Sequence, residues 1–347
     1  MESLPSAAAS ATLMHREAAE AGAAVARFLD ANRTRLAALG DQLRRAPPTV
    51  VMTCARGSSD HAATYGKYLL ESRARVPVTS LAPSIASLYQ ARFDNVRGAV
   101  VIAISQSGRS PDLLASVQAQ QEAGALVVAL VNDITSPLAL IADMLLPLHA
   151  GPERSVAATK TCIVSMAGLA AIVAAWTGDA ALSDALDRLP GQLDRAFALD
   201  WSPGVAALAA AGSLFVIGRG CGFGVAQEMA LKLKETCALH AEAFSAAEVR
   251  HGPMAIVKRG FPVIALATSD ESGASVRQVA AELATRSAQV LVADSVEPGV
   301  LPALPDHPAI EPILALESFY AMANRLALAR GLDPDTPPYL AKVTQTV

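Results

Sequence analysis

Several proton-transfer groups lie within one short stretch of the sequence, residues 230–255, which reads ALKLKETCALHAEAFSAAEVRHGPMA. Its ionisable side chains include Lys232, Glu235, His240, Glu242, Glu248 and His251. If the start of the stretch is helical, Glu228, Lys232 and Glu235 share one face, because a helix turns by about 100° per residue. A carboxylate beside an ammonium group could move protons next to a carbonyl. Spacing alone, however, favours a solvated ion pair between Glu228 and Lys232.

The two histidines of this stretch lie in different settings. His240 has the surroundings expected of a structural histidine in the core. His251 directly precedes Gly252-Pro253, where a loop can present a side chain to a pocket. An imidazole titrates near neutral pH and therefore suits acid–base catalysis. For His251 the pattern leaves a structural and a catalytic role open.

A second candidate site follows the apolar run at 99–104, in the segment SQSGRSP. Ser110 suits the N-cap of a helix and Pro111 suits its first position. A strand that feeds a helix N-terminus through hydroxyls and free backbone N–H groups favours binding of an anion such as a phosphomonoester. An ordinary capped turn remains the alternative. The candidate phosphate ligands in this segment are Ser105, Gln106, Ser107 and Ser110.

The segment RGSS at 56–59 follows another apolar run and contains Gly57, Ser58 and Ser59. In an open α/β sheet, the carboxyl ends of the strands form the edge where ligands bind. We therefore expect these residues to contribute to the same site.

The sequence contains an internal repeat that predicts the fold. TVVMTCARGSSDHAATYGKYLLE (49–71) and LFVIGRGCGFGVAQEMALKLKE (214–235) share an apolar run, an Arg-Gly pair and a helical pattern at an offset of 163. The runs at 99–110 and 261–272 match at an offset of 162. Each copy alternates β-branched runs with helical segments, which is typical of parallel β-α-β units. The predicted fold class is α/β, with two tandem doubly wound parallel-sheet domains. Because the second copy has Asp270 and Glu271 in the equivalent loop, we expect only the first copy to bind phosphate.

Turn signals divide the chain into four segments. We predict an N-terminal helical segment at 1–45, with one long helix over 12–45, and a first domain at 46–198. A second domain at 199–331 carries the helix of Lys232 and Glu235 and the histidine loop. The Pro-rich segment 332–347 is predicted to be a tail without helix or strand, and the family resemblance described below implies that it belongs to the active site.

Composition narrows the partners and the cellular setting. The chain has 347 residues, a net charge of −4 and no basic cluster, which argues against nucleic-acid binding. The longest apolar run, 163–176, is shorter than the roughly 20 residues of a membrane-spanning helix, so we expect a buried helix and no membrane. No export signal is recognisable, so a cytoplasmic protein is expected. The cysteines lack metal-ligand spacing, and GRGCGFG (218–224) is a weak dinucleotide fingerprint, so we predict no metal and no cofactor.

Four separated motifs occur in an order that closely resembles the sugar isomerase (SIS) family. They are SQSGRSPD, ERSVAATK, ALKLKETCALHAEAFSAAEVRHGP and PPYLAKVTQTV. Within this family, the chain is similar to the isomerase half of glucosamine-6-phosphate synthase (glutamine:fructose-6-phosphate amidotransferase). The resemblance implies that a phosphorylated hexose or hexosamine is the substrate, and that Ser59 joins the phosphate ligands. It implies that the sugar is lined by Gly57, Ser58, Val156, Ala158 and Ala341.

The same resemblance implies roles for four catalytic residues. Glu235 would shuttle a proton between C1 and C2 of the sugar with assistance from Lys232. His251 would open the sugar ring in the neighbouring subunit's site, so a homodimer is implied. Lys342 matches the Schiff-base lysine of the family.

Three departures from the synthase pattern narrow the expected activity. Only about 45 residues precede the first predicted strand, so we expect no glutaminase domain there. Arg56 stands where the synthase has cysteine, and Ala158 stands where it has serine. The chain therefore looks most like the SIS-type glucosamine-6-phosphate deaminase, which would convert D-glucosamine 6-phosphate and water to D-fructose 6-phosphate and ammonia.

Other activities remain open at the level of the sequence. A deglycase or ketose–aldose isomerase acting on another phosphosugar would use the same residues. A synthase that uses ammonia from a separate glutaminase subunit is a further alternative. A non-catalytic sugar-phosphate sensor is disfavoured, because Glu235, His251 and Lys342 are all present.

Overall fold

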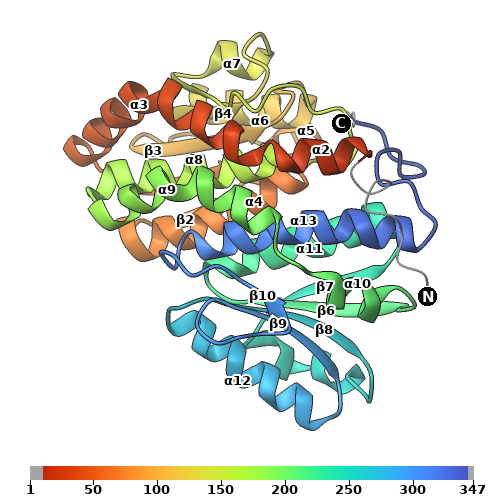
Figure 1. Ribbon diagram of the computed structural model, residues 1–347. Coiled ribbons are helices and arrows are strands. Elements are labelled where there is room, and N and C mark those ends of the chain that lie inside the picture. The colour runs from red at the N-terminus through yellow and green to blue at the C-terminus, as the bar shows by residue number, and fades with distance from the viewer. Residues whose placement is uncertain (1–10, 343–347) are drawn as a thin grey trace. The chain divides into compact units, whose positions relative to one another are not determined.

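The computed structural model describes residues 11–342 of the chain (Figure 1). Backbone contacts divide these residues into two compact units, neither of which is continuous in sequence. The first, here called the β1–β5 unit, comprises residues 23–152 and 164–187. The second, the β6–β10 unit, comprises residues 11–22, 153–163 and 188–342. Each unit contains one five-stranded sheet.

The sheet of the β1–β5 unit is parallel throughout, with the order β2-β1-β3-β4-β5. All seven residues of its central strand β3 are buried, as expected for a parallel sheet with helices on both faces. The strands are β1 (Val50–Cys54), β2 (Val78–Ser80), β3 (Ala99–Ser105), β4 (Leu126–Val131) and β5 (Met144–Pro147).

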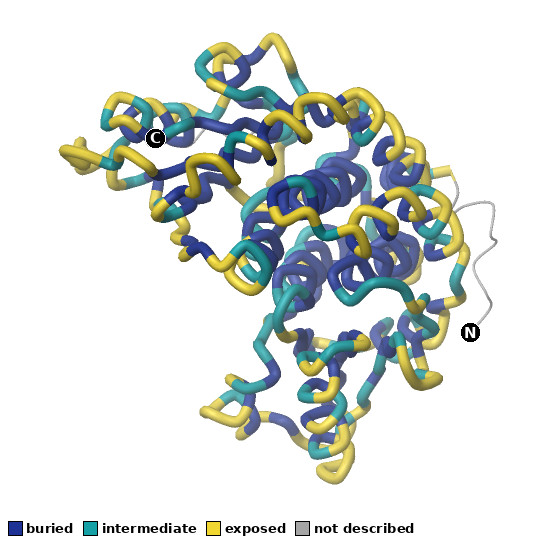
Figure 2. Tube along the Cα trace, turned by 90° about the vertical axis from the view of Figure 1, so that its left-hand side faces the viewer, coloured by how far each residue is buried: buried dark blue, intermediate teal, exposed yellow. Residues whose placement is uncertain are grey.

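The helices before, between and after these strands include the long α3 and α8. They are α3 (Ala21–Arg45), α4 (Ser58–Leu69) with the π-helical turn η1 (Leu70–Ala74), α5 (Ser84–Ser87), α6 (Pro111–Glu122), α7 (Pro137–Ile141), α8 (Lys160–Thr177) and α9 (Ala180–Phe197). By length and composition α8 could cross a membrane, but 89% of it is buried within the folded chain. Figure 2 shows helical turns that are buried on all sides, which is typical of core helices. The expectation of a buried helix at 163–176 is therefore confirmed.

The sheet of the β6–β10 unit is also parallel, with the order β10-β9-β8-β6-β7. Its strands are β6 (Ser213–Gly218), β7 (His240–Ser245), β8 (Pro262–Ala267), β9 (Gln289–Asp294) and β10 (Leu301–Pro302). Its helices are α2 (Leu13–Ala19), α10 (Ser202–Leu208), α11 (Cys221–Cys237), the 3-10 turns η2 (Glu248–His251) and η3 (Pro253–Ile256), α12 (Glu271–Thr285) and α13 (Glu311–Ala329).

The two sheets have the same topology, which confirms the predicted fold. When β6 is matched with β1 and β8 with β3, both sheets follow the doubly wound order 2-1-3-4-5. The Arg-Gly pair of the repeat follows β1 in one sheet and β6 in the other. The offset found in the sequence therefore relates structurally equivalent positions.

One local prediction was wrong. The single helix expected over residues 12–45 is two helices, α2 and α3, which separate at Glu20. The stretch after Cys237 does not continue as a helix, because Ala238 adopts a left-handed conformation (φ 46°) that ends α11. The residues that follow form strand β7, the edge strand beside β6.

Candidate functional site

The loops after β1 and β3 meet at the point where the strand order of the β1–β5 unit reverses. The two strands are paired in parallel, with Cys54 opposite Ala103, so both chain segments leave the sheet at the same edge. Helix α4 leaves from one side of this point and α6 from the other. Open α/β sheets bind ligands at such a reversal. The predicted phosphate ligands at 56–59 and 105–110 therefore lie at one edge of one sheet.

Backbone geometry shapes both loops. Gly57 precedes α4 with φ 53° and ψ −130°, a backbone conformation that residues other than glycine rarely adopt. Gly108 has φ 63°, and a Cβ atom there would lie 2.2 Å from the Ser136 hydroxyl. The Ser105 hydroxyl accepts a hydrogen bond from the Gly108 N–H at 3.0 Å, which closes a tight turn after β3.

Helix α6 begins in this turn without a side-chain cap. Ser110 is its N-cap residue, but its hydroxyl makes no capping hydrogen bond, and Pro111 occupies the first position. The first N–H groups of a helix carry partial positive charge and favour an anion. The half-buried Gln106 and Ser107 lie in the same turn. These features suit an anion supplied from solution.

The equivalent turn of the β6–β10 unit contains its own anion. The Asp270 carboxylate caps α12 by accepting hydrogen bonds from the backbone N–H groups of Ser272 and Gly273. It also accepts hydrogen bonds from the Thr268 and Ser272 hydroxyls, each at 2.6 Å. Burial would raise the pKa of Asp270, but these hydrogen bonds lower it below its ordinary value. In the second copy, the Asp270 carboxylate therefore takes the place that an anion from solution would take in the first copy.

Arg56 links the two loops of the β1–β5 unit. Its Nε donates to the Asp112 carboxylate at 3.1 Å, and its Nη2 forms an ion pair with the same oxygen. The Asp112 side chain is fully buried in the first turn of α6, whereas about half of the Arg56 side chain is exposed. The guanidinium therefore fixes the loop after β1 to the start of α6.

The β6–β10 unit brings Lys232 and Glu235 together near the end of α11. The Lys232 ammonium donates a hydrogen bond to Glu235 Oε2 and lies 3.4 Å from Glu228 Oε1. The side chains of Lys232 and Glu228 are 1% and 0% exposed, so their pair is not solvated, and that interpretation of the spacing was wrong. Both faces of α11 are covered, by its sheet and by α13, and helical spacing cannot reveal such double burial. Glu235 keeps 22% of its side chain exposed and is the member of the group that a ligand can reach.

The charges around Lys232 determine its protonation state. Burial alone would lower the pKa of Lys232, but the carboxylates of Glu228 and Glu235 raise it well above the ordinary value. Lys232 therefore remains an ammonium ion at neutral pH. A fixed positive charge beside Glu235 can stabilise negative charge that develops on a reacting oxygen.

The loop at 153–160 is held by buried carboxylates. Glu153, which is 5% exposed, accepts hydrogen bonds from the backbone N–H groups of Thr159 (3.0 Å) and Thr161 (3.2 Å). Glu17 on α2 accepts from the N–H groups of Arg154 and Ser155. The half-buried Val156 and Ala158 lie on this loop.

Lys342 contacts the same loop. Its ammonium donates to the Ser155 carbonyl at 2.8 Å and lies 3.3 Å from the Glu153 carboxylate. The backbone N–H of Val156 also donates to the Asp335 carbonyl, which ties the C-terminal segment to the loop. Two of the predicted site residues, Val156 and Lys342, are therefore brought together, and the exposed Ala341 is adjacent in sequence.

His251 and His240 are both exposed. His251 ends η2 directly before Gly252, as expected for a presented side chain. His240 begins β7, so the core role considered for it was wrong. Among the described residues 11–342, no hydrogen bond or ion pair joins His251 to Glu235.

One residue of this site, Glu153, was missed in the sequence. It contacts Lys342 across 189 positions, and its place at the start of the motif ERSVAATK was the available signal for it. Glu228, the buried partner of Lys232, was recognised by spacing, but its burial was not.

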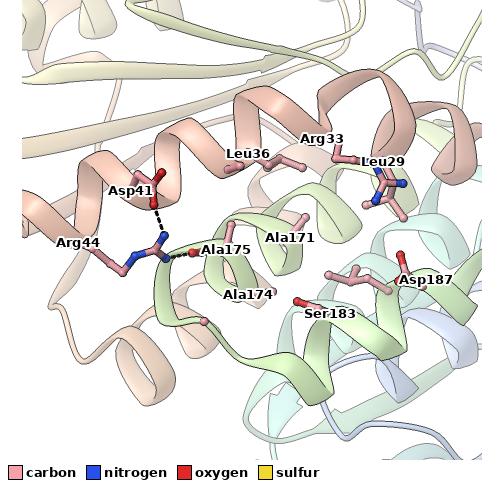
Figure 3. A pocket seen from close by; sticks show the side chains of 13 residues that line it. Leu29, Arg33, Leu36, Asp41, Arg44, Ala171, Ala174, Ala175, Ser183 and Asp187 are labelled. Carbon is pink, nitrogen blue, oxygen red and sulfur yellow. Dashed lines mark hydrogen bonds and ion pairs between the residues drawn. The ribbon is translucent and has the colours of Figure 1, made fainter.

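Within residues 11–342, no three His, Cys, Asp or Glu side chains are grouped as metal ligands. A groove of about 530 Å³ in the β1–β5 unit lies between α3 and the α8–α9 segment (Figure 3). At one end of it Arg44 forms an ion pair with Asp41 and donates to the Ala175 carbonyl. None of the predicted site residues lines this groove, so we do not place the site there.

Comparison with known proteins agrees with the fold. The family model described as "SIS domain" matches residues 47–175 and 207–309. The glutamine–fructose-6-phosphate aminotransferase (isomerizing) of Aeropyrum pernix is 37% identical over 311 residues, which cover 82% of this chain and 49% of that protein. The chain thus spans about half the length of the curated relatives it matches.

Solved structures give the same result. A crystal structure from Silicibacter pomeroyi described as a phosphosugar isomerase is 43% identical, with a TM-score of 0.89, and covers 93% of this chain and 100% of that one. A structure named glucosamine-6-phosphate deaminase, from Thermotoga maritima, is 20% identical with a TM-score of 0.72 and the same coverage. The latter likeness concerns the fold alone. Together, the two matching domains and the similarity over most of its length show that the chain belongs to the SIS-domain family.

Proposed function

We propose that this protein is a phosphosugar isomerase that deaminates D-glucosamine 6-phosphate. The overall reaction consumes one water molecule and gives D-fructose 6-phosphate and ammonia. Ring opening would expose the C1 aldehyde. Transfer of a proton from C2 to C1 would then give an imine at C2, and hydrolysis of this imine would release ammonia.

The observation that carries the proposal is the hydrogen bond between Lys232 and Glu235. A partly exposed carboxylate beside a buried ammonium that stays charged at neutral pH suits the enolisation of a carbonyl compound. Glu235 would remove the C2 proton and return a proton at C1. Lys232 would stabilise the charge that develops on oxygen in between.

The remaining roles rest on the family resemblance and on local geometry. The turn after β3, with Ser105, Gln106, Ser107 and Ser110, would bind the phosphate, and Ser59 would contribute from the start of α4. Gly57, Ser58, Val156, Ala158 and Ala341 would line the sugar. The exposed His251 would open the ring, and Lys342 would act near the reacting carbons.

The proposal also covers the oligomeric state of the protein and its cellular location. We infer a homodimer in which His251 serves the partner's site, which is compatible with the exposure of that side chain. We also infer a cytoplasmic protein. None of the four cysteines, all within the described residues, forms a disulfide, as expected in a reducing compartment.

A second candidate is an ammonia-dependent synthase that runs the reaction in the opposite direction. It is favoured by the name of the curated relatives, which are aminotransferases. The same proton transfer serves both directions, so the assay has to be run once from glucosamine 6-phosphate and once from fructose 6-phosphate and ammonium.

The test is release of ammonia and fructose 6-phosphate from glucosamine 6-phosphate by the purified chain, without glutamine. We expect both products in equal amounts. The variant Glu235→Gln should lose roughly 10²–10⁴ fold in turnover, because it lacks the proton carrier, and should still bind the phosphosugar. Retention of near-wild-type activity would exclude Glu235 as the base.

Binding of the sugar without release of either product would contradict the deaminase. Formation of glucosamine 6-phosphate from fructose 6-phosphate and ammonium, with no other nitrogen donor present, would indicate the synthase.

A further inference from the structure

A buried hydrogen-bonded chain leads from the interior of the β6–β10 unit to Glu235. The Tyr320 hydroxyl on α13 lies 3.1 Å from Glu228 Oε1, and Glu228 in turn contacts Lys232 at 3.4 Å. Cys162, in the first turn of α8, shares a hydrogen bond with the same tyrosine hydroxyl. Tyr320, Glu228 and Lys232 are each no more than 1% exposed, and Cys162 is 2% exposed.

The direction of the hydrogen bonds follows from the chemistry of the groups. Burial, together with Cys162 and Glu228, holds the pKa of Tyr320 well above its ordinary value, so the phenol keeps its proton. The hydroxyl has one proton to donate, and the carboxylate of Glu228 is the stronger acceptor. The Cys162 thiol can then donate to the phenol oxygen. Its own pKa is raised by burial and by Glu228, so it also stays protonated.

The titratable neighbours of this hydroxyl come from two helices and one loop. Glu228 and Lys232 belong to α11, and Cys162 belongs to α8. The carboxylate of Glu153, from the loop at 153–160, raises the pKa of the Cys162 thiol. All four lie in the β6–β10 unit.

Tyr320 influences Glu235 indirectly, through the side chains of Glu228 and Lys232. The Lys232 ammonium donates a hydrogen bond to Glu235 and forms an ion pair with Glu228. Tyr320 satisfies part of the acceptor capacity of Glu228. In a dry environment, a carboxylate that loses one donor binds its remaining donor more strongly. Without the phenol, Glu228 would therefore draw the ammonium away from Glu235.

We propose that Tyr320 is a positioning residue for the proton-transfer pair, because its hydroxyl orients Glu228 and thereby keeps Lys232 on Glu235. This proposal rests on the function proposed above. It adds a residue from another helix, whose hydroxyl donates to Glu228 and not to either member of the proton-transfer pair. It also assigns a role to a buried polar group that the reaction itself does not use.

The test is Tyr320→Phe, which removes one oxygen and keeps the ring. We expect turnover to fall by about tenfold, the equivalent of one good buried hydrogen bond, with little change in KM. The pH–rate profile should change as well, because the ammonium charge of Lys232 would lie further from Glu235. A purely structural role for the hydroxyl would not change this profile.

Ser318→Ala is the matched control. Ser318 lies two residues earlier on α13, is 1% exposed, and donates its hydroxyl proton to the Ala196 carbonyl at 2.7 Å. Its loss also removes a buried hydrogen bond of α13, but not one to Glu228. We expect comparable thermal destabilisation of the two variants and a shifted pH profile only in Tyr320→Phe.

A second measurement separates this proposal from the proposed reaction. The carboxyl carbon of Glu235 can be followed by NMR at one fixed pH in glutamate-labelled protein, with Glu235→Gln used to assign the signal. A changed chemical shift in Tyr320→Phe, absent in Ser318→Ala, would support the positioning role even if the wild-type protein released no ammonia. An unchanged chemical shift together with an unchanged pH profile would overturn it.

Discussion

Gly57 and Gly220 adopt the same backbone conformation at the same point of the two sheets. Gly57 has φ 53° and ψ −130° directly before α4, and Gly220 has φ 57° and ψ −135° directly before α11. Each residue follows the arginine of the repeated Arg-Gly pair. The duplication therefore extends to the strained residue that lets each helix start directly after its strand.

Alanine at either glycine should destabilise the protein. A side chain at this combination of φ and ψ costs about 1–3 kcal/mol. At Gly57 a Cβ would meet no atom within 4 Å, so the cost is purely conformational, whereas at Gly220 it would also lie 3.2 Å from Ser272. We expect both variants to melt at lower temperature, with Gly220→Ala affected more.

The control for this pair is Gly191→Ala. Gly191 lies inside α9, and an added Cβ would meet no atom within 4 Å. Alanine is preferred to glycine within a helix by roughly 0.5–1 kcal/mol, so this variant should melt at a higher temperature. Equal melting temperatures for Gly57→Ala and the wild type would contradict the strain at Gly57.

Glu228→Gln should unfold more easily than the wild type. Removing one member of a buried ion pair typically costs about 3–5 kcal/mol, because the other charge is left without its partner. The double variant Glu228→Gln/Lys232→Met should recover most of this loss. A double-mutant cycle on urea unfolding measures the coupling, and an additive result would show that the pair contributes nothing.

The pH dependence of this effect has a defined sign. The pKa of Lys232 is raised in the folded protein, so its stabilising contribution is fully present below the ordinary value of 10.5 and is lost as the pH rises through the folded value. The difference in stability between Glu228→Gln and the wild type should therefore stay constant from pH 6 to pH 9. A difference that grows across this range would contradict a charged Lys232.

Mixed dimers test where His251 acts. If His251 serves the neighbouring subunit's site, a dimer of one Glu235→Gln and one His251→Asn subunit contains one site with both native residues. Random mixing of equal amounts should then restore about a quarter of wild-type activity, because half of the dimers are mixed and each has one intact site of two. If His251 acts within its own subunit, the mixture should be no more active than either variant alone.

Lys342 should not form a borohydride-stable adduct with fructose 6-phosphate. Its ammonium donates to the Ser155 carbonyl and pairs with the buried Glu153 carboxylate, and a nucleophilic amine would have to give up both partners. Intact-protein mass spectrometry after reduction makes the measurement, with Lys342→Ala as the blank. An adduct that is present in the wild type and missing in this variant would restore the Schiff-base role.

The fold was predictable because the repeat supplied two copies of the same information. An Arg-Gly pair after each apolar run located β1 and β6, and the second offset located β3 and β8. Strand β7 was missed because its sequence, HAEAFS, continues an alanine-rich helical pattern. The left-handed residue that ends α11 is Ala238 and not a glycine, so the sequence does not indicate this helix end.

The candidate site was predictable only where its residues lie close together in sequence. Lys232 and Glu235 are three positions apart and were recognised as a pair. Tyr320 contacts Glu228 across 92 positions, and no pattern in a single sequence connects such residues. Burial was also hidden, since a charged helical face has the same spacing whether water or another helix covers it.

The Asp270 cap has a consequence for how the two domains respond to metabolite levels. An anion that is part of the chain is present at constant effective concentration, so α12 is stabilised whatever the cell contains. Helix α6 depends instead on an anion from solution, and ligand binding stabilises a folded domain in proportion to the logarithm of ligand concentration. Under the proposed function, a falling supply of phosphosugar would thus loosen the turn that begins α6, and the resistance of this turn to proteolysis would report the substrate level, whereas the Asp270 cap of α12 would stay in place.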